Sequence, residues 1–132
     1  MLDHLSIGDL ARQTGCKIPT IRYYEGVGLI PAPARTEGNQ RRYTAWHLER
    51  IAFIRHARAL GFDLDVIREL LSLSDEPGRS CAVVDAIARR RRADIDARIH
   101  QLRVLGAELD RMIRQCAGGK IAECWIIKAL GR

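Results

Sequence analysis

The sequence is short of aromatic residues and prolines, and it contains no long apolar run. Aromatic residues make up 5% of its 132 residues and prolines number 4, a balance typical of a mainly helical protein rather than an all-β one. No apolar run approaches the roughly 18 residues that a membrane-spanning helix requires. The N-terminus has neither the basic nor the apolar region of a secretory signal peptide. We therefore expect a cytoplasmic protein with no membrane partner.

Length and cysteine content set further bounds. The chain has room for one domain of ordinary size, but not for a DNA-binding domain plus a separate small-molecule domain. Its 4 cysteines, in a reducing compartment, are expected to be metal ligands or free thiols rather than a disulfide framework. No nucleophile, base and orienting group converge in the pattern, so we do not expect an enzyme.

Basic residues concentrate in the first half of the chain. The formal net charge is +6. The stretch from Arg12 to Arg58 holds nine basic residues and three acidic ones, so its own net charge equals that of the whole chain. This distribution favours an anionic partner for the N-terminal half.

The N-terminal residues have the pattern of a helix-turn-helix. Ser6 and Asp9 form a capping-box pattern that opens a short helix over residues 7–13. Gly15 then supplies a left-handed turn, and a second short helix follows over residues 19–25. We expect these two helices to pack as a DNA-binding motif.

Residues 26–43 are expected to form a wing. Glycine, proline and asparagine punctuate this stretch, which predicts two short strands. Thr44 caps a following helix over residues 44–60, and another short helix begins at Asp63. Residues 1–74 are therefore predicted to form a winged helix-turn-helix domain.

A long helix over residues 81–116 is the main feature of the second half. A linker over residues 75–80 precedes it, and a loop with a short apolar tail, residues 117–132, follows it. Apolar residues recur along the helix at sevenfold steps, the signature of a coiled-coil seam. At 1.5 Å per residue the helix is on the order of 54 Å long, and alone it cannot bury such a stripe, so we expect a partner helix from a second copy. The seam residues are Ile95, Leu102, Leu109 and Cys116.

An ordered series of motifs runs through the first half: Thr20-Ile-Arg-Tyr-Tyr-Glu25, Gly28-Leu-Ile30, Pro33, Arg35, Asn39, Arg41, Tyr43 and Arg58-Ala-Leu-Gly-Phe62. This series resembles the MerR family of transcriptional regulators. The resemblance implies a winged helix-turn-helix homodimer, joined through an antiparallel coiled coil, on a promoter whose two recognition elements are spaced too far apart. It also implies that metal binding makes the dimer twist this double-stranded DNA, so that RNA polymerase can use the promoter.

Four residues in or near the start of the predicted recognition helix are candidates for contacts with DNA. With Arg22 and Tyr24 pointing outward, the helix offers a cation and a hydroxyl to phosphates and base edges. Lys17 and Thr20 lie near its start and add to this surface. We expect these side chains to face the DNA.

The resemblance adds three arginines as contacts with the DNA backbone. Arg35 and Arg41 lie on the wing, and Arg55 lies on the helix that follows. The alternative for each arginine is a solvated surface charge. Gln40 stands where many relatives carry tyrosine before the wing arginine, so we expect the wing contact to differ there.

Three cysteines form the candidate metal site. Cys116 and Cys124 flank a seven-residue loop with two glycines, so the chain can fold back and present both sulfurs to one ion. Cys81 starts the long helix, where free N–H groups favour a thiolate. Cys81 and Cys116 lie at opposite ends of that helix, but in the antiparallel dimer Cys81 of one chain falls beside the loop of the other. This arrangement predicts two three-thiolate sites at the dimer interface.

Three thiolates favour a soft or borderline ion over Mg or Ca. The resemblance implies cadmium, lead, zinc or mercury, because regulators of divalent ions carry Cys at the position of Cys81, whereas those of copper(I) and gold(I) carry Ser. The loop length and the sequence after Cys124 instead look like the copper(I) branch, so copper(I) stays open as the alternative. The cysteines could also be free or buried thiols. Cys16, in the helix-turn-helix turn, is expected to pack in the interior.

The sequence therefore predicts a metal-responsive transcriptional activator that distorts promoter DNA to switch on metal-resistance or efflux genes. A thiol-based redox regulator is an alternative, because thiolates near a helix start are oxidisable. A small metal-buffering protein could use the same thiols, but it would need neither the helix-turn-helix nor the wing.

Overall fold

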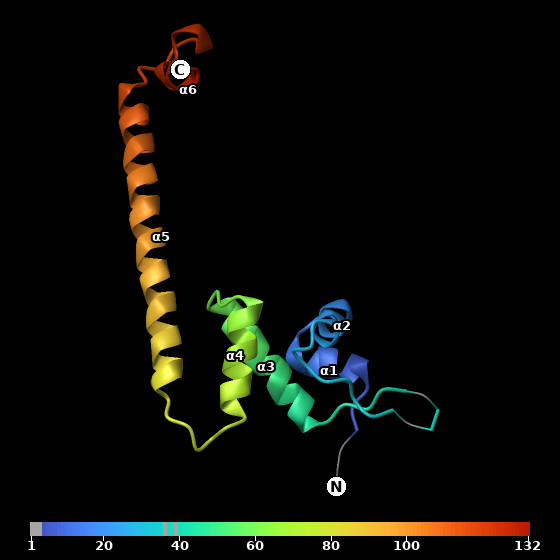
Figure 1. The fold of residues 1–132 in the computed structure, drawn as a ribbon. Helices are drawn as coiled ribbons and strands as arrows, with labels where there is room; N and C mark the ends of the chain where they lie inside the picture. Colours follow the sequence, from blue (N-terminus) through green and yellow to red (C-terminus); the bar gives the residue numbers. More distant parts are fainter. Residues whose placement is uncertain (1–3, 36, 39) are drawn as a thin grey trace. The chain divides into compact units, whose positions relative to one another are not determined.

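The computed structural model describes residues 4–35, 37–38 and 40–132, and the chain divides into two compact units, Met1–Val84 and Asp85–Arg132 (Figure 1). The described residues are mainly helical, as predicted. Helix α5 begins in the first unit and continues through the second. In chain order the helices are α1 (Ile7–Thr14), α2 (Ile18–Gly26), α3 (Ala45–Ala59), α4 (Leu64–Ser74), α5 (Ala82–Gln115), the 3-10 helix η1 (Ile121–Glu123) and α6 (Trp125–Leu130).

The predicted helix-turn-helix is formed by α1 and α2. The Ser6 hydroxyl accepts from the Asp9 N–H at 3.0 Å, and the Asp9 carboxylate accepts from the Ser6 N–H at 3.1 Å, which completes the capping box. Hydrogen bonds from Ser6, first from its backbone and then from its hydroxyl, lower the pKa of Asp9. Gly15 ends α1 at a φ of 70°, and Pro19 lies in the first turn of α2, where its missing N–H costs no hydrogen bond.

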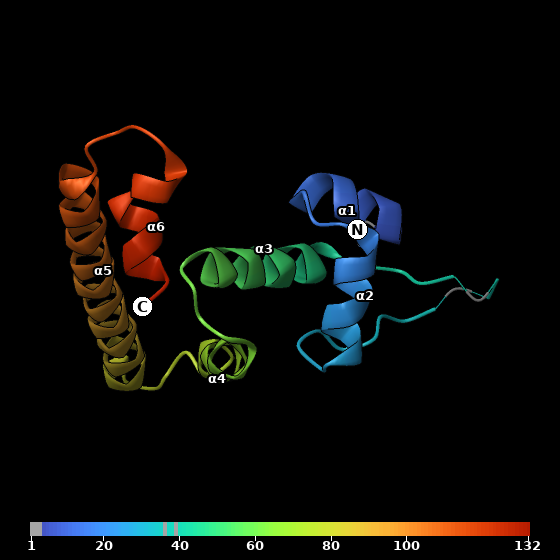
Figure 2. The same cartoon turned by 90° about the horizontal axis from the view of Figure 1, so that it is seen from above.

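The four helices of the first unit enclose one apolar core. Helix α1 packs against α2 and α3, and α3 packs against α4. Figure 2 shows α3 running from α1 and α2 at one end to α4 at the other. Each fully buried aliphatic side chain contributes about 2 kcal/mol, so this unit is stabilised by its own residues. Its largest fully buried side chains are Tyr43, Leu10, Ile21, Ile30, Ile51, Ile54 and Ile67.

The wing is less regular than the two strands predicted. Its two segments pair at one isolated antiparallel bridge between Arg35 and Arg41, and the Arg42 N–H donates to the Ala34 carbonyl at 2.8 Å. In the described residues of the wing, this pairing makes a loop closed by a single bridge rather than a strand ladder. Asn39, one of the motif residues, lies outside the described residues.

Caps and the half-buried Arg50 position α3 and α4. Thr44 and His47 form a capping box at the start of α3, and the Asp63 carboxylate caps α4. Arg50 on α3 donates to both carboxylate oxygens of Asp75, directly after α4. Both of these bonds come from Nη2, while Nη1 donates to the Leu71 carbonyl at 3.4 Å and to the Ser74 hydroxyl at 3.3 Å. Arg50 therefore holds the end of α4 against α3 through charge-assisted hydrogen bonds.

Helix α5 agrees with the predicted long helix, and its 34 residues span about 51 Å. Of its seam side chains, Leu102 and Leu109 are 53% and 57% exposed in the single chain, and Ile95 and Cys116 are half buried. Leu105, between two seam residues, is 59% exposed. Within residues 85–132, all of which are described, Met112 is the one buried side chain. A turn leads from α5 into η1 and α6. None of the helices formed by the described residues is long and apolar enough to cross a membrane.

Candidate functional site

Two exposed cations lie on or directly before α2, the predicted recognition helix. Arg22 is exposed in the middle of the helix, and Lys17 is exposed at the position that precedes it. Thr20 is half buried in the first turn. Lys17 and Thr20 therefore lie near the start of α2, as predicted, and Arg22 is exposed on the helix.

The predicted outward orientation of Tyr24 is wrong. Its side chain is 7% exposed, whereas that of the neighbouring Tyr23 is 53% exposed. Helical periodicity explains why Tyr24 is buried and Tyr23 exposed. Tyr24 lies three residues after the fully buried Ile21 and so faces the core with it. Burial is also the main cause that raises the pKa of Tyr24. The tyrosine available at the surface of α2 is Tyr23.

A hollow of about 410 Å³ lies at the turn between α1 and α2. Three cations border it: Lys17 from the turn, and Arg55 and Arg58 from α3. Arg58 was not predicted as a contact, although its spacing of three from Arg55 places both on one face of α3. Cys16 also borders the hollow and is 6% exposed within the core, as predicted, and burial is the main cause that raises the pKa of its thiol. The hollow is cationic and suits a phosphate group.

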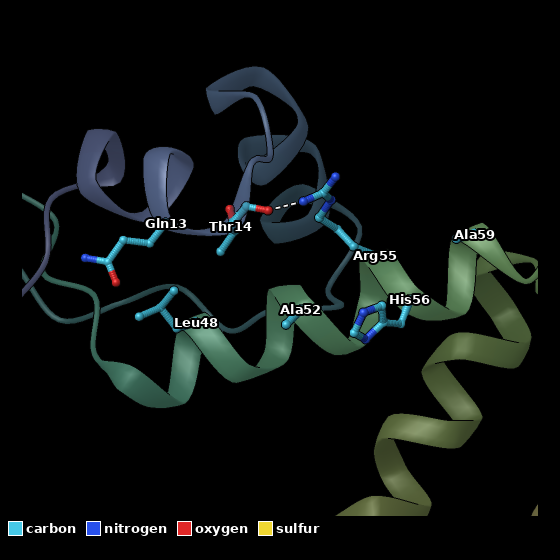
Figure 3. A pocket seen from close by; sticks show the side chains of 7 residues that line it. All are labelled: Gln13, Thr14, Leu48, Ala52, Arg55, His56 and Ala59. Carbon is cyan, nitrogen blue, oxygen red and sulfur yellow. Dashed lines mark hydrogen bonds between the residues drawn. The ribbon is translucent and has the colours of Figure 1, made fainter.

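Arg55 also holds the turn itself. Its guanidinium donates to the carbonyl of Thr14, the last residue of α1 (Figure 3). A Cβ at Gly15 would lie 2.8 Å from Arg55 Nη1, so the glycine leaves the space that this contact needs. Arg55 therefore fixes the end of α1 to α3. It also borders a second hollow of about 330 Å³, lined by Gln13, Thr14, Leu48, Ala52, His56 and Ala59.

The two wing arginines have different surroundings. Arg35 is exposed. Arg41 Nη1 lies 3.5 Å from Glu25 Oε2 near the end of α2, and its side chain is 32% exposed against 10% for Glu25. The Tyr43 hydroxyl donates to the other oxygen of Glu25. Arg41, predicted as a contact with the DNA backbone, is thus engaged in an ion pair that leaves part of its guanidinium accessible.

The loop after α5 brings Cys116 and Cys124 together. Gly118 and Gly119 adopt φ values of 79° and 96°, a conformation that favours glycine and reverses the chain. Cys116 is half buried just after α5, and Cys124 is half buried just before α6. The two thiols interact, and this interaction is among the causes that lower the pKa of Cys124.

Backbone amides at the start of α6 favour the Cys124 thiolate. The largest cause of its lowered pKa is a hydrogen bond from the N–H of Ile127. Partial desolvation raises the pKa, and a hydrogen bond from the N–H of Ile126 lowers it further. A thiolate is the form of cysteine that binds metal. Two neighbouring sulfurs of this kind fit a soft or borderline ion rather than Mg or Ca.

Cys81 lies in the first unit, directly before α5. Its side chain is exposed, and the Ser80 hydroxyl accepts from the Ala82 N–H at 3.2 Å at the helix start. Cys81 borders a hollow of about 270 Å³ that Phe53 and Leu70 also line. No three His, Cys, Asp or Glu side chains gather into a metal-binding group in the described part of the chain. A single chain thus brings together two of the three predicted cysteine ligands.

Comparison with known families and proteins gives matches along most of the chain. The family model described as "MerR HTH family regulatory protein" matches residues 5–74, and the model "MerR, DNA binding" matches residues 48–112. The regulator CueR of Yersinia pestis is 38% identical over 96% of this chain and 91% of its own. The regulator ZntR of Escherichia coli K12 is 40% identical over 94% of this chain and 90% of its own.

Two solved structures share both fold and sequence with the chain. PbrR691 from Ralstonia metallidurans CH34, in complex with lead(II), is 40% identical with a TM-score of 0.86, covering 96% of this chain and 98% of that one. MerR from Bacillus megaterium MB1, in complex with mercury(II), is 29% identical with a TM-score of 0.76, covering 97% and 100%. Both regulators were crystallised with a heavy metal ion.

Proposed function

The chain belongs to the MerR family of DNA-binding transcriptional regulators, and on this premise we propose that it is a homodimeric, metal-responsive activator in the cytoplasm. The dimer binds a promoter whose two recognition elements are too far apart. Metal binding distorts that DNA, and RNA polymerase then transcribes metal-resistance or efflux genes. The observation that carries the proposal is that Cys116 and Cys124 flank a loop which Gly118 and Gly119 reverse, in a chain whose basic first half folds as a helix-turn-helix.

The DNA-binding surface combines α2, the turn before it and the wing. Exposed cations on α2 and the wing supply contacts to phosphates, and the cationic hollow at the turn accepts a further phosphate. Arg58 joins the predicted set because it borders that hollow. Tyr23 replaces Tyr24 as the tyrosine facing the DNA. The proposed contacts are Lys17, Thr20, Arg22, Tyr23, Arg35, Arg41, Arg55 and Arg58.

The seam of α5 supports the dimer. Leu102, Leu105 and Leu109 are more than half exposed in the single chain, and apolar residues at sevenfold spacing pack against a second helix in coiled coils. An antiparallel pairing of two α5 helices covers this stripe. It also brings the start of one α5 near the end of the other.

The proposed metal site is completed across that dimer. Cys116 and Cys124 of one chain hold the ion together with Cys81 of the other, which is exposed directly before α5. A soft ion bound there supplies a strong link between three thiolates. Because those thiolates come from two chains, filling the site changes how the two DNA-binding units are held.

The proposed inducer is a divalent ion among cadmium, lead, zinc and mercury. Three thiolates suit such ions, and the similar regulators PbrR691 and MerR were crystallised with lead(II) and mercury(II). Copper(I) is the second candidate, because two adjacent thiols such as Cys116 and Cys124 are enough for a linear site.

A competitive titration of the reduced dimer tests this assignment. Cadmium, lead, zinc and copper(I) are added to the wild type and to Cys81→Ser, and thiolate-to-metal absorption is followed. We expect the wild type to prefer a divalent ion and Cys81→Ser to lose that preference. Cys16→Ser is the matched control, because Cys16 is buried in the core, and it should bind as the wild type does.

Two outcomes would overturn the assignment. If copper(I) is preferred and Cys81→Ser has no effect, the loop pair alone is the sensor. If no ion binds to the reduced protein, the metal-responsive function fails. In that case, transcription in vitro is measured from a promoter that the protein selects. A change in transcript level would indicate a regulator without a metal inducer, and no change would indicate a protein that does not act on promoters.

A further inference from the structure

Glu25 occupies an unfavourable place for a carboxylate. It lies near the C-terminal end of α2, where the partial negative charge of the helix repels an anion. Its side chain is only 10% exposed, and removing a charge from water is costly unless it is paired. Interactions with other residues must therefore hold Glu25 there.

Each carboxylate oxygen of Glu25 has its own partner from the segment after the wing tip. The hydroxyl of Tyr43 donates to Oε1, and Arg41 Nη1 lies 3.5 Å from Oε2. Burial and then this hydrogen bond raise the pKa of Tyr43 to about 12, so its hydroxyl stays a donor at physiological pH. The carboxylate thus joins the recognition helix to two points of one segment.

That segment is itself fixed to the rest of the first unit. Tyr43 is fully buried, and its backbone exchanges two hydrogen bonds with Leu5, at 2.7 and 2.8 Å. Arg41 pairs with Arg35 across the wing. Holding Arg41 beside Glu25 therefore also sets where the wing lies relative to α2.

We propose that Glu25 is a positioning residue for DNA binding, which orients the Arg41 guanidinium and holds the wing against the recognition helix. The inference rests on the proposed DNA-binding function and deepens it. Arg41 Nη1 lies beside Glu25, and the guanidinium also interacts with the Tyr43 hydroxyl. The Arg41 side chain is 32% exposed, so part of the guanidinium can still donate to a phosphate. Glu25 thereby strengthens phosphate binding indirectly, because it holds the Arg41 guanidinium in the orientation that a phosphate needs.

The expected change in DNA affinity on removing Glu25 is opposite in sign to the change that simple electrostatics predicts. Removing a negative charge from a DNA-binding surface ordinarily strengthens binding, because fewer like charges face the phosphates. Glu25→Gln keeps an oxygen acceptor for Tyr43 but loses the charge that orients Arg41. We therefore expect Glu25→Gln to bind DNA roughly tenfold more weakly, the effect of losing one hydrogen bond to a charged group.

The test uses the whole chain of 132 residues and a duplex that the wild type enriches from a random-sequence library. Affinity is measured over a range of salt concentrations for the wild type, Glu25→Gln and Glu37→Gln. Glu37 is the matched control, since it is an exposed carboxylate on the same wing, and Glu37→Gln should bind as well as the wild type or better. For Glu25→Gln, the slope of log affinity against log salt should fall by about one phosphate contact. A merely destabilised protein would lose active fraction without this change in slope.

Arg41→Gln provides a second route should Glu25→Gln lose its cooperative thermal transition. This variant leaves the Tyr43 to Glu25 hydrogen bond in place, and we expect the same loss of affinity and of salt slope. The double variant should bind no more weakly than Arg41→Gln alone. Equal or tighter binding by Glu25→Gln with an unchanged slope, or additive losses in the double variant, would overturn the proposal. Failure of the proposed function would be visible separately, as a wild type that enriches no duplex.

Discussion

The two units of the chain are stabilised in opposite ways. In the first, long-range pairs such as Arg50 with Asp75 join different elements around a buried core. In the second, ion pairs such as Arg89 with Asp85 join residues of the same helix, and such pairs are worth only about 0.3 kcal/mol each. Along the fully described residues 85–132, Met112 alone is buried.

This difference indicates that the two units have different functions. The first unit can hold its DNA-binding surface with its own side chains. The second unit exposes an apolar stripe and offers two of the three proposed metal ligands. In the proposed dimer it depends on a second chain both for stability and for its site. A ligand that binds at such an interface is well placed to act on both DNA-binding units.

The largest effect is expected from a charge in the α5 seam. Leu109, 57% exposed in the single chain, is buried in the proposed dimer, and Leu109→Asp places a charge there in both copies. We expect the dimer to weaken by roughly 3 kcal/mol, about a hundredfold in its dissociation constant. Analytical ultracentrifugation measures this, with Ala107→Asp as the exposed control on the same helix. An unchanged dimer would place the interface elsewhere.

Truncation in the core of the first unit should act on folding instead. Ile54 is fully buried, and Ile54→Ala should lower the free energy of unfolding by about 3 kcal/mol. Urea unfolding followed by the fluorescence of Trp46 on α3 reports on this unit. The matched change Val104→Ala, at a side chain 55% exposed on α5, should cost less than about 0.5 kcal/mol. Equal losses in the two variants would remove the contrast between the units.

A smaller loss is expected at the turn of the helix-turn-helix. Gly15 has a φ of 70°, and an added Cβ would meet the Arg55 guanidinium. Gly15→Ala should therefore lower the unfolding free energy by about 2 kcal/mol and weaken DNA binding. Gly78→Ala is the control, because nothing lies within 4 Å of its added Cβ. A stable Gly15→Ala protein would contradict the role of Arg55 in holding this turn.

The smallest effect concerns pH. Burial lowers the pKa of His47 below its ordinary value of 6.5, so the unfolded chain takes up the proton first as pH falls. The stability that His47 contributes is thus full above about pH 6.5 and declines as pH falls through the window toward its folded pKa. The urea midpoint of the first unit should decrease across that window, and His47→Gln should flatten the dependence. An equally steep decrease in His47→Gln would assign it to other groups.

Local features of the fold could be predicted from the sequence. The capping box of Ser6 with Asp9, the turn at Gly15 and the extent of α5 depend on residues near one another in the chain. The pairing of Cys116 with Cys124 was predictable for the same reason, since two glycines lie in the loop between them.

Features that depend on tertiary packing were missed or wrong. Tyr23 and Tyr24 are adjacent and identical, and only the packing of α2 decides which of them is buried. The contacts of Arg41 with Glu25 and of Arg55 with Thr14 join residues far apart in sequence. In the sequence alone, both arginines look like ordinary surface charges. Their contacts in the structure give each of them a second, structural role.

Mixed dimers test most directly whether the metal site is shared between two chains. Cys81→Ser and Cys116→Ser chains, carrying different tags, are combined and the mixed dimer is purified and titrated with cadmium. Each parent homodimer lacks a complete site, whereas the mixed dimer retains one, because Cys81 of one chain meets the intact loop of the other. The account predicts one cadmium ion per mixed dimer and none at comparable affinity in either parent. A mixed dimer that binds no better than its parents would contradict it.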